Sequence, residues 1–158
     1  MTEQRDALQH SPVKPRPPGD SLKQRDAEAA MIEAVGRAHS KSLSSRRIDL
    51  GDGVAVQVDG VADDRSLLCE AFAHQGPLKG GQTHKVLSDA FKLSFLGRRF
   101  PKAELILVFS DEQAARPFIA GRSWVSKAVE ALGVKVEVVQ LPDATRVRLR
   151  DAQERQRR

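Results

Sequence analysis

Polar and hydrophobic residues alternate over two stretches of the chain, as they do in strands that bury one face. One stretch covers residues 54–59 and the other covers residues 66–73, and the turn GVADDR separates them. A weaker strand signal at 46–50 precedes the sequence GDG, which favours a hairpin turn. Because tight turns join strands that run in opposite directions, these three strands are predicted to form an antiparallel meander.

Spacings of three and four residues between apolar side chains indicate two longer helices. The first helix runs from Asp20 or Ser21 to about His39, and the second covers about residues 82–96. Polar residues at similar spacing, Gln82, Lys85, Asp89 and Lys92, share another side of the second helix. The predicted apolar stripes are Ala27, Met31, Ala34 and Ala38 in the first helix and Val86, Ala90 and Leu93 in the second.

The C-terminal half alternates between strand and helix signals. Residues 104–109 (ELILVF) are continuously apolar, which is typical of a strand covered on both faces. Short helices at 111–118 and 123–132 lead to a strand at 134–141, and Pro142 opens a terminal helix. The strand–helix–strand segment predicts a right-handed parallel crossover. The order αβββαβ(α)αβα therefore predicts an α/β fold, in which a mixed central sheet is flanked by helices.

Composition divides the chain into three parts. A length of 158 residues suits one folded domain, which we place at residues 21–141. Residues 1–20 contain four prolines and few apolar side chains, so a disordered N-terminal arm is expected there. Residues 142–158 form the expected basic C-terminal helix.

Cysteine content and hydropathy limit the protein's class. Cys69 is the single cysteine, which excludes an internal disulfide and the common cysteine-rich zinc sites and fits a reducing cytoplasm. No apolar run reaches the roughly 20 residues that span a bilayer. The first residues contain no apolar signal segment. A cytoplasmic protein without a membrane span is expected.

The net charge of +5 is concentrated near the C-terminus. Residues 142–158 carry six arginines and three acids, which gives +3. A basic segment attracts nucleic-acid phosphates. Arg146, Arg148 and Arg150 are therefore candidate nucleic-acid-binding residues, and a solvated helix end is the alternative.

Two carboxylates are predicted to lie on adjacent antiparallel strands. Asp59 ends one of these strands, and Glu70 lies midway along the next. Carboxylates placed side by side repel unless a cation neutralises them, and Mg²⁺ prefers such oxygen ligands. In the alternative reading, Asp59 begins a turn and Glu70 pairs with Lys85 or Arg65.

The same residues resemble a known family. The element order, with V-D-G followed by L-C-E-A-F-A, is similar to that of the PD-(D/E)XK superfamily, whose fold is that of restriction endonucleases. The longer segment that ends in HQGPLKGGQTHKVLSDAFKL resembles small actinobacterial proteins of that fold. The resemblance covers roughly residues 21–141 and implies a restriction-endonuclease-like αβββαβ core.

The resemblance also implies roles for individual residues. Asp59 matches the first metal-binding acid of superfamily nucleases, and Glu70 matches the acid of the (D/E)-X-K motif. Glu28 or Glu33 matches a glutamate on the first helix that sometimes joins them. Gln82 matches a glutamine that recurs on the second helix of RecB-like members. Mg²⁺ is the implied cofactor.

The match fails at the lysine of (D/E)-X-K, because Phe72 follows Glu70-Ala71. Some superfamily members supply this lysine from the next helix, which makes Lys85 the candidate, and Lys79 in the loop is a poorer one. We therefore expect a degenerate or altered nuclease that binds nucleic acid. The alternatives are an active Mg²⁺-dependent nuclease that uses Lys85, and a non-catalytic protein–protein scaffold, including a homodimer joined through the terminal helix.

Overall fold

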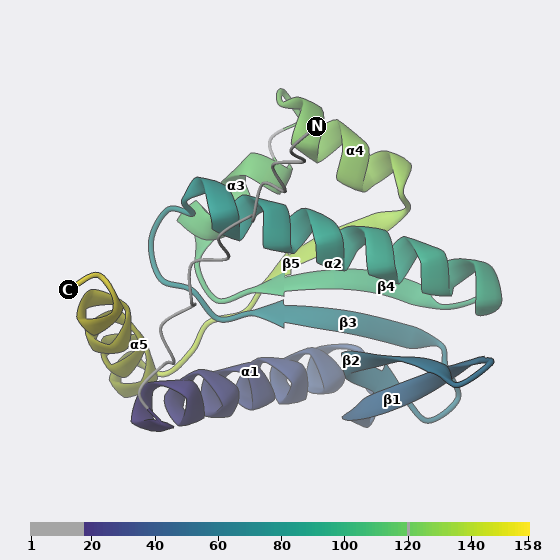
Figure 1. Ribbon diagram of the computed structural model, residues 1–158, viewed down its shortest axis with the longest axis horizontal. Helices are drawn as coiled ribbons and strands as arrows, with labels where there is room; N and C mark the ends of the chain where they lie inside the picture. Colours follow the sequence, from purple (N-terminus) through teal and green to yellow (C-terminus); the bar gives the residue numbers. More distant parts are fainter. Residues whose placement is uncertain (1–17, 120) are drawn as a thin grey trace, which may run out of the picture.

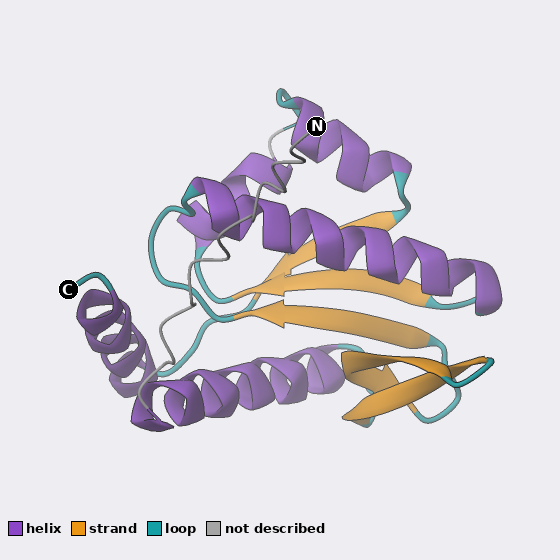
Figure 2. Cartoon of the chain, in the orientation of Figure 1, coloured by secondary structure: helices purple, strands orange, loops and turns teal. Residues whose placement is uncertain are grey.

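The predicted α/β class is confirmed by a computed structural model, which describes residues 18–119 and 121–158. A five-stranded mixed sheet lies between helices on both faces (Figure 1; Figure 2). The helices are α1 (Pro18–Ala38), α2 (Gly80–Arg99), α3 (Glu112–Ile119), α4 (Trp124–Ala131) and α5 (Asp143–Gln156). The strands are β1 (Leu43–Gly51), β2 (Val54–Ala62), β3 (Leu67–Phe72), β4 (Glu104–Phe109) and β5 (Val134–Val138).

The sheet has the strand order β1-β2-β3-β4-β5. The first three strands form the predicted antiparallel meander, and β3, β4 and β5 run parallel to one another. Asp52 and Gly53 form the hairpin turn with φ of 54° and 75°. Positive φ at both central residues gives the backbone twist that matches two neighbouring strands, so the GDG sequence specifies this hairpin.

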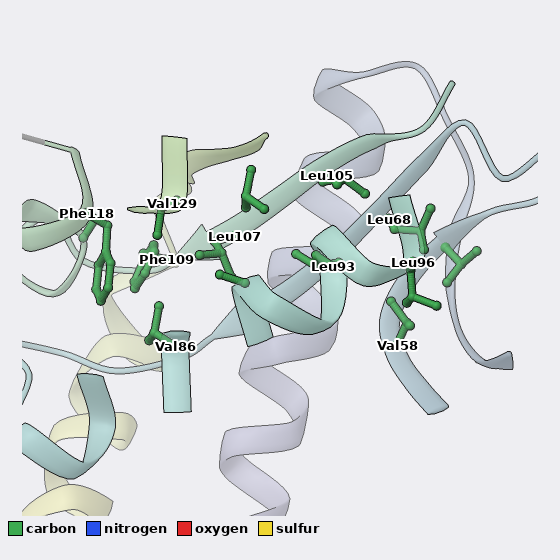
Figure 3. Packing of buried hydrophobic residues seen from close by; sticks show 14 of the residues in the cluster. Val58, Leu68, Val86, Leu93, Leu96, Leu105, Leu107, Phe109, Phe118 and Val129 are labelled. Carbon is green, nitrogen blue, oxygen red and sulfur yellow. The ribbon is translucent and has the colours of Figure 1, made fainter. Parts of the chain in front are cut away.

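Two hydrophobic cores cover the two faces of the sheet, as the alternation in β3 predicts. Leu68 faces α2 and belongs to a core with Leu93 and Phe109, part of which Figure 3 shows. Leu67 and Cys69 face the other way, into the core that α1 covers. Successive residues of a strand point to opposite faces, so the sequence of β3 serves both cores at once.

Helix α1 begins earlier than predicted. Its first residue is Pro18, so Asp20 and Ser21 lie inside the first turn and do not precede the helix. The expected arm overlaps the helix at residues 18–20, and its residues 1–17 lie outside the described part of the chain.

The predicted apolar stripe of α1 is correct at Ala27 and Met31 and wrong further along. Ala38 is exposed, whereas Ile32 and Val35 are buried against the sheet. The larger apolar side chains remove more surface from water than alanine does, so they set the helix's rotation.

Helix α5 packs on α1 of the same chain, and Figure 1 shows the two side by side. Leu149 and Ala152 are the buried residues of α5. The apolar side of the terminal helix is thus covered without a second copy, and the homodimer stays a prediction. No helix of the described residues combines the length and the apolar character that crossing a bilayer requires.

Candidate functional site

Strands β2 and β3 are paired only briefly. Their two residue pairs are Gly60 with Cys69 and Val61 with Leu68. Beyond Gly60 the two strands separate, so the rest of β3 is paired only with β4. The separation leaves main-chain groups of β3 without a strand partner on that side, and such groups need another partner when they are buried.

Asp59 lies where the two strands separate. The sequence predicted that it ends its strand, but β2 continues to Ala62. The register of the β1–β2 pairing shifts between Val58 and Val61, as in a β-bulge, and Asp59 lies within this shift. A bulge turns a side chain away from regular alternation. The Asp59 carboxylate consequently accepts a hydrogen bond from the main-chain N–H of Ala71 at 3.0 Å.

Glu70 lies beside Asp59 and is almost fully buried, with 4% of its surface exposed. Burial, a hydrogen bond with Asp59 and the charge of Asp59 raise the pKa of Glu70 to about 8. The structure therefore brings together the two carboxylates whose convergence the sequence predicted. Burial and the neighbouring carboxylate thus favour the protonated form of Glu70, because two adjacent negative charges in a poorly solvated site repel.

The lysine that meets Glu70 is Lys92, not Lys85. The Lys92 ammonium lies 2.6 Å from Glu70 Oε1. It also donates a hydrogen bond to the Gln57 carbonyl at 3.0 Å, so it bridges the separated strands β2 and β3. Its side chain is 25% exposed, which holds the charge close to the carboxylates and partly away from water.

Lys85 lies nearer the solvent, with a side chain that is 61% exposed. It pairs with Asp89 at 3.2 Å and lies 5.6 Å from the centre of the Phe72 ring. Partial burial is the largest single influence and acts to lower the pKa of Lys85, but the charge and hydrogen bond of Asp89, together with the charges of Asp59 and Glu28, outweigh it, so the pKa is raised. Phe72 thus fills the expected lysine position and supports a cation above its ring.

The two carboxylates and the two lysines line one cavity of about 390 Å³ between α1 and α2. Glu28, the first-helix glutamate implied by the resemblance, lines it, whereas Glu33 does not. Glu33 instead pairs with Arg37 at 2.8 Å on the surface of α1. The residues that line this cavity, which we call the acidic cleft, include Glu28, Asp59, Glu70, Lys85, Asp89 and Lys92.

Gln82 does not line the acidic cleft. It accepts a hydrogen bond from the Lys79 N–H at the start of α2, and its amide contacts His74 Nδ1 at 3.2 Å. Burial lowers the pKa of His74, so its neutral ring accepts this bond at Nδ1 and donates from Nε2 to the Pro77 carbonyl. Gln82 therefore positions the loop before α2, and Lys79 is an exposed residue of that loop.

The candidate arginines of α5 have different surroundings. Arg148 and Arg150 are exposed. Arg146 instead donates a hydrogen bond to the side chain of Gln75, a buried residue of the loop that follows β3. The Gln75 main chain is bonded at both its N–H and its carbonyl by Gln153 of α5. Arg146 is therefore part of a buried polar network that fastens α5 to the sheet.

The acidic cleft contains an adjacent pair of carboxylates, Asp59 and Glu70, of the ligand type that Mg²⁺ takes. Glu70 Oε1 is buried and, apart from the ion pair with Lys92, accepts no hydrogen bond among the described residues. No group of three or more His, Cys, Asp and Glu residues suited to a metal occurs there. Mg²⁺ is commonly held by one or two carboxylates together with water and substrate phosphate, so Asp59 and Glu70 are enough protein ligands by number, although Lys92 contacts one Glu70 oxygen.

Helical spacing contained a signal for Lys92, because Lys85, Asp89 and Lys92 share one polar side of α2. The position of α2 along the sheet, which no local pattern gives, decides that the second lysine reaches Glu70. The cleft combines an acid pair, an ammonium group and access from solvent. Comparison with protein-family models, curated proteins and solved structures gives no match to this chain.

Proposed function

We propose that this protein is an altered nuclease of the PD-(D/E)XK type, which acts on phosphodiester bonds. The observation that carries the proposal is the convergence of Asp59, Glu70 and Lys92 in the acidic cleft. Phe72 removes the lysine from its usual strand position, and Lys92 supplies an ammonium group from α2 instead. The protein would thus differ from other nucleases of this type in the residue that supplies the positive charge.

Asp59 and Glu70 would hold Mg²⁺, which supplies charge neutralisation for the phosphate and activates water when it is bound. Lys92 keeps a positive charge beside Glu70, where negative charge develops as a phosphodiester reacts. Lys85 is more exposed and carries a full positive charge at the mouth of the cleft. Its charge would attract the incoming phosphate toward the more buried ammonium of Lys92.

Metal binding must displace the proton that Glu70 retains below pH 8. Metal ligands act in their deprotonated form, so affinity for Mg²⁺ rises as pH rises toward the pKa of Glu70. Cleavage should increase over the same range. A pH profile thus links activity to this carboxylate.

The direct test is incubation of the full chain with plasmid, single-stranded DNA and RNA in the presence of Mg²⁺. We expect cleavage that EDTA abolishes and that Asp59→Asn lowers by about a hundredfold or more, since a metal ligand is weakened. Asp52→Asn is the matched control, because Asp52 is exposed in a turn whose positive φ asparagine accepts. Equal activity in the two variants, or no cleavage of any substrate, contradicts the proposal.

A second candidate is a protein that binds nucleic acid without cleaving it. The ion pair between Lys92 and Glu70 favours this reading, because the ammonium occupies an oxygen that a metal would need. Such a protein binds oligonucleotides equally well with and without Mg²⁺. Calorimetric titration of Mg²⁺ into the wild type and Asp59→Asn separates the two readings.

A further inference from the structure

The side of helix α2 that faces away from the sheet carries two large aromatic side chains. Phe91 and Phe95 are 69% and 53% exposed, and their positions are neighbours on the helix surface because they lie four residues apart. The buried residues of α2 lie on its other side and are Val86, Ala90, Leu93 and Leu96. Phenylalanine is usually buried, so two exposed rings on one helix are typical of a surface that contacts a partner.

The exposed side of α2 carries cations and no acid. The helix has four Lys or Arg residues and one acid, Asp89, which gives a net charge of +3. Asp89 lies on the side of the acidic cleft, between Lys85 and Lys92. Arg98 and Arg99 are exposed in the last turn, and neither side chain forms an ion pair or a hydrogen bond with another described residue. A positive surface without compensating acids attracts an anionic partner.

The exposed rings are connected to the acidic cleft along the helix. Lys92, Phe95 and Arg99 follow one another at spacings of three and four residues, which places them in one row on the surface of α2. Lys92 lines the cleft and contacts Glu70, whereas Phe95 and Arg99 lie beyond the cleft. We call this row, together with Phe91, the α2 ridge. An anionic chain that lies along the ridge therefore reaches the ammonium group beside the acid pair.

We propose that the α2 ridge binds single-stranded nucleic acid and directs it to the acidic cleft. Bases stack on Phe91 and Phe95, and a backbone phosphate pairs with Arg99. In a duplex the bases stack on one another, so the rings find no free base face. An acidic peptide matches the charge of the ridge but brings no phosphodiester bond to the cleft. The inference rests on the proposed function for its ligand class and adds the strand type and the surface that holds the strand.

The first experiment measures binding of a fluorescent oligothymidylate to the full chain in EDTA, so that cleavage plays no part. We expect Phe91→Ala and Phe95→Ala each to weaken binding about tenfold, the scale of one lost base contact. Val54 is the matched control, because it is an apolar residue of the β1–β2 hairpin with a similar exposure of 56%. Val54→Ala should bind as the wild type does, and circular dichroism checks the fold of each variant.

Two further substitutions distinguish base stacking from general apolar contact. Phe95→Leu keeps an apolar side chain but removes the ring, so it should bind as weakly as Phe95→Ala. Phe95→Trp supplies a larger aromatic surface and should bind at least as tightly as the wild type. If Phe95→Leu binds as the wild type does, apolar contact is sufficient and the inference is wrong.

Charge supplies an independent pair of variants. Arg99→Gln should reduce the slope of log affinity against log salt by about 0.7, the value for one phosphate contact on a single strand. Arg148 is the matched control, because it is an exposed arginine of a different helix, α5. Arg148→Gln should leave the slope unchanged. A change of slope in Arg148→Gln alone would show that the strand binds α5 and would overturn the inference.

Competition identifies the class of partner. The unlabelled single strand should displace the labelled strand more effectively than either its duplex or polyglutamate does. Equal displacement by polyglutamate, preference for the duplex, or wild-type binding by both alanine variants overturns the inference.

These outcomes are separate from the fate of the proposed function. Binding that depends on Phe91 and Phe95 without any cleavage supports the α2 ridge and rejects the nuclease. Cleavage by the two alanine variants with the kcat and KM of the wild type supports the nuclease and rejects the ridge.

Discussion

Two clusters of buried polar residues lie near the same strand, and they differ in how their groups are satisfied. In the network around Gln75, the side-chain amide donates to Ser110 and accepts from Arg146, and both main-chain groups are bonded to Gln153. In the acidic cleft, Glu70 is as deeply buried, yet its pKa is raised and its Oε1 has the Lys92 ammonium as its one partner among the described residues.

The difference separates a structural role from a candidate chemical one. A buried polar network whose members are all bonded stabilises a single arrangement of the chain. A buried charge that is only partly compensated costs folding free energy and is typical of functional sites. The Gln75 network fastens α5, whereas the acid pair of the cleft is compensated only by Lys92 and one main-chain N–H among the described residues.

The largest expected effect concerns the two lysines of the cleft. Lys92→Met should lower the cleavage rate by about 10²–10³-fold, as the loss of one preorganised charge partner does elsewhere. Lys85→Met should cost about tenfold or less, since Lys85 does not contact Glu70. Initial rates with Mg²⁺ in excess provide the measurement, and circular dichroism checks the fold. A larger loss of cleavage rate in Lys85→Met than in Lys92→Met would show that Lys85, not Lys92, supplies the essential ammonium group.

The next effect concerns the proton on Glu70. Its folded pKa of about 8 lies above the ordinary glutamate pKa of 4.5, so the folded state binds more protons than the unfolded state between these values. Stability from this group is complete below pH 4.5 and is lost as pH rises toward 8, by about 1.4 kcal/mol per pH unit within that window. Glu70→Gln should flatten this slope in urea denaturation without Mg²⁺. A slope equal to that of the exposed-site control Glu130→Gln would show that Glu70 titrates normally.

A smaller effect tests the satisfied network. Gln75→Ala leaves the Ser110 and Arg146 groups without their partner, and should lower the free energy of unfolding by about 2–3 kcal/mol. Gln140 is exposed, and Gln140→Ala should change stability by about 0.5 kcal/mol or less. Mg²⁺ affinity of the folded variant should remain that of the wild type. If Gln75→Ala stayed stable but lost Mg²⁺ binding, the Gln75 network would have to contribute to the acidic cleft, contrary to this interpretation.

The smallest effect is expected at Phe72. Phe72→Leu removes the ring below Lys85 and its contact with Phe109, whose ring centre lies 6.0 Å away. We expect a loss of about 1 kcal/mol in stability, since an exposed cation–π contact and a ring pair are each worth about that or less. Cleavage should change by less than about threefold, as measured beside the lysine variants. A loss of cleavage rate as large as that of Lys92→Met would show that the Phe72 ring contributes to catalysis.

Local patterns in the sequence predicted most of the fold and half of the candidate site. Alternation placed Leu68 and Glu70 on one face of β3 because strand periodicity depends only on neighbouring residues. The same pattern misplaced Asp59 at a strand end, since a bulge depends on pairing with β1. The family resemblance favoured Lys85, whereas Lys92 is the lysine that contacts Glu70.

The sequence by itself determined the element order, the class of fold and the two faces of β3, because periodicity and turn chemistry act over a few residues. Tertiary structure alone decided that β2 leaves β3 beside Asp59, that α2 carries Lys92 to Glu70, and that α5 closes on Gln75. These contacts join residues far apart in the chain. They follow from how whole helices and strands pack, which the burial of their larger apolar side chains sets.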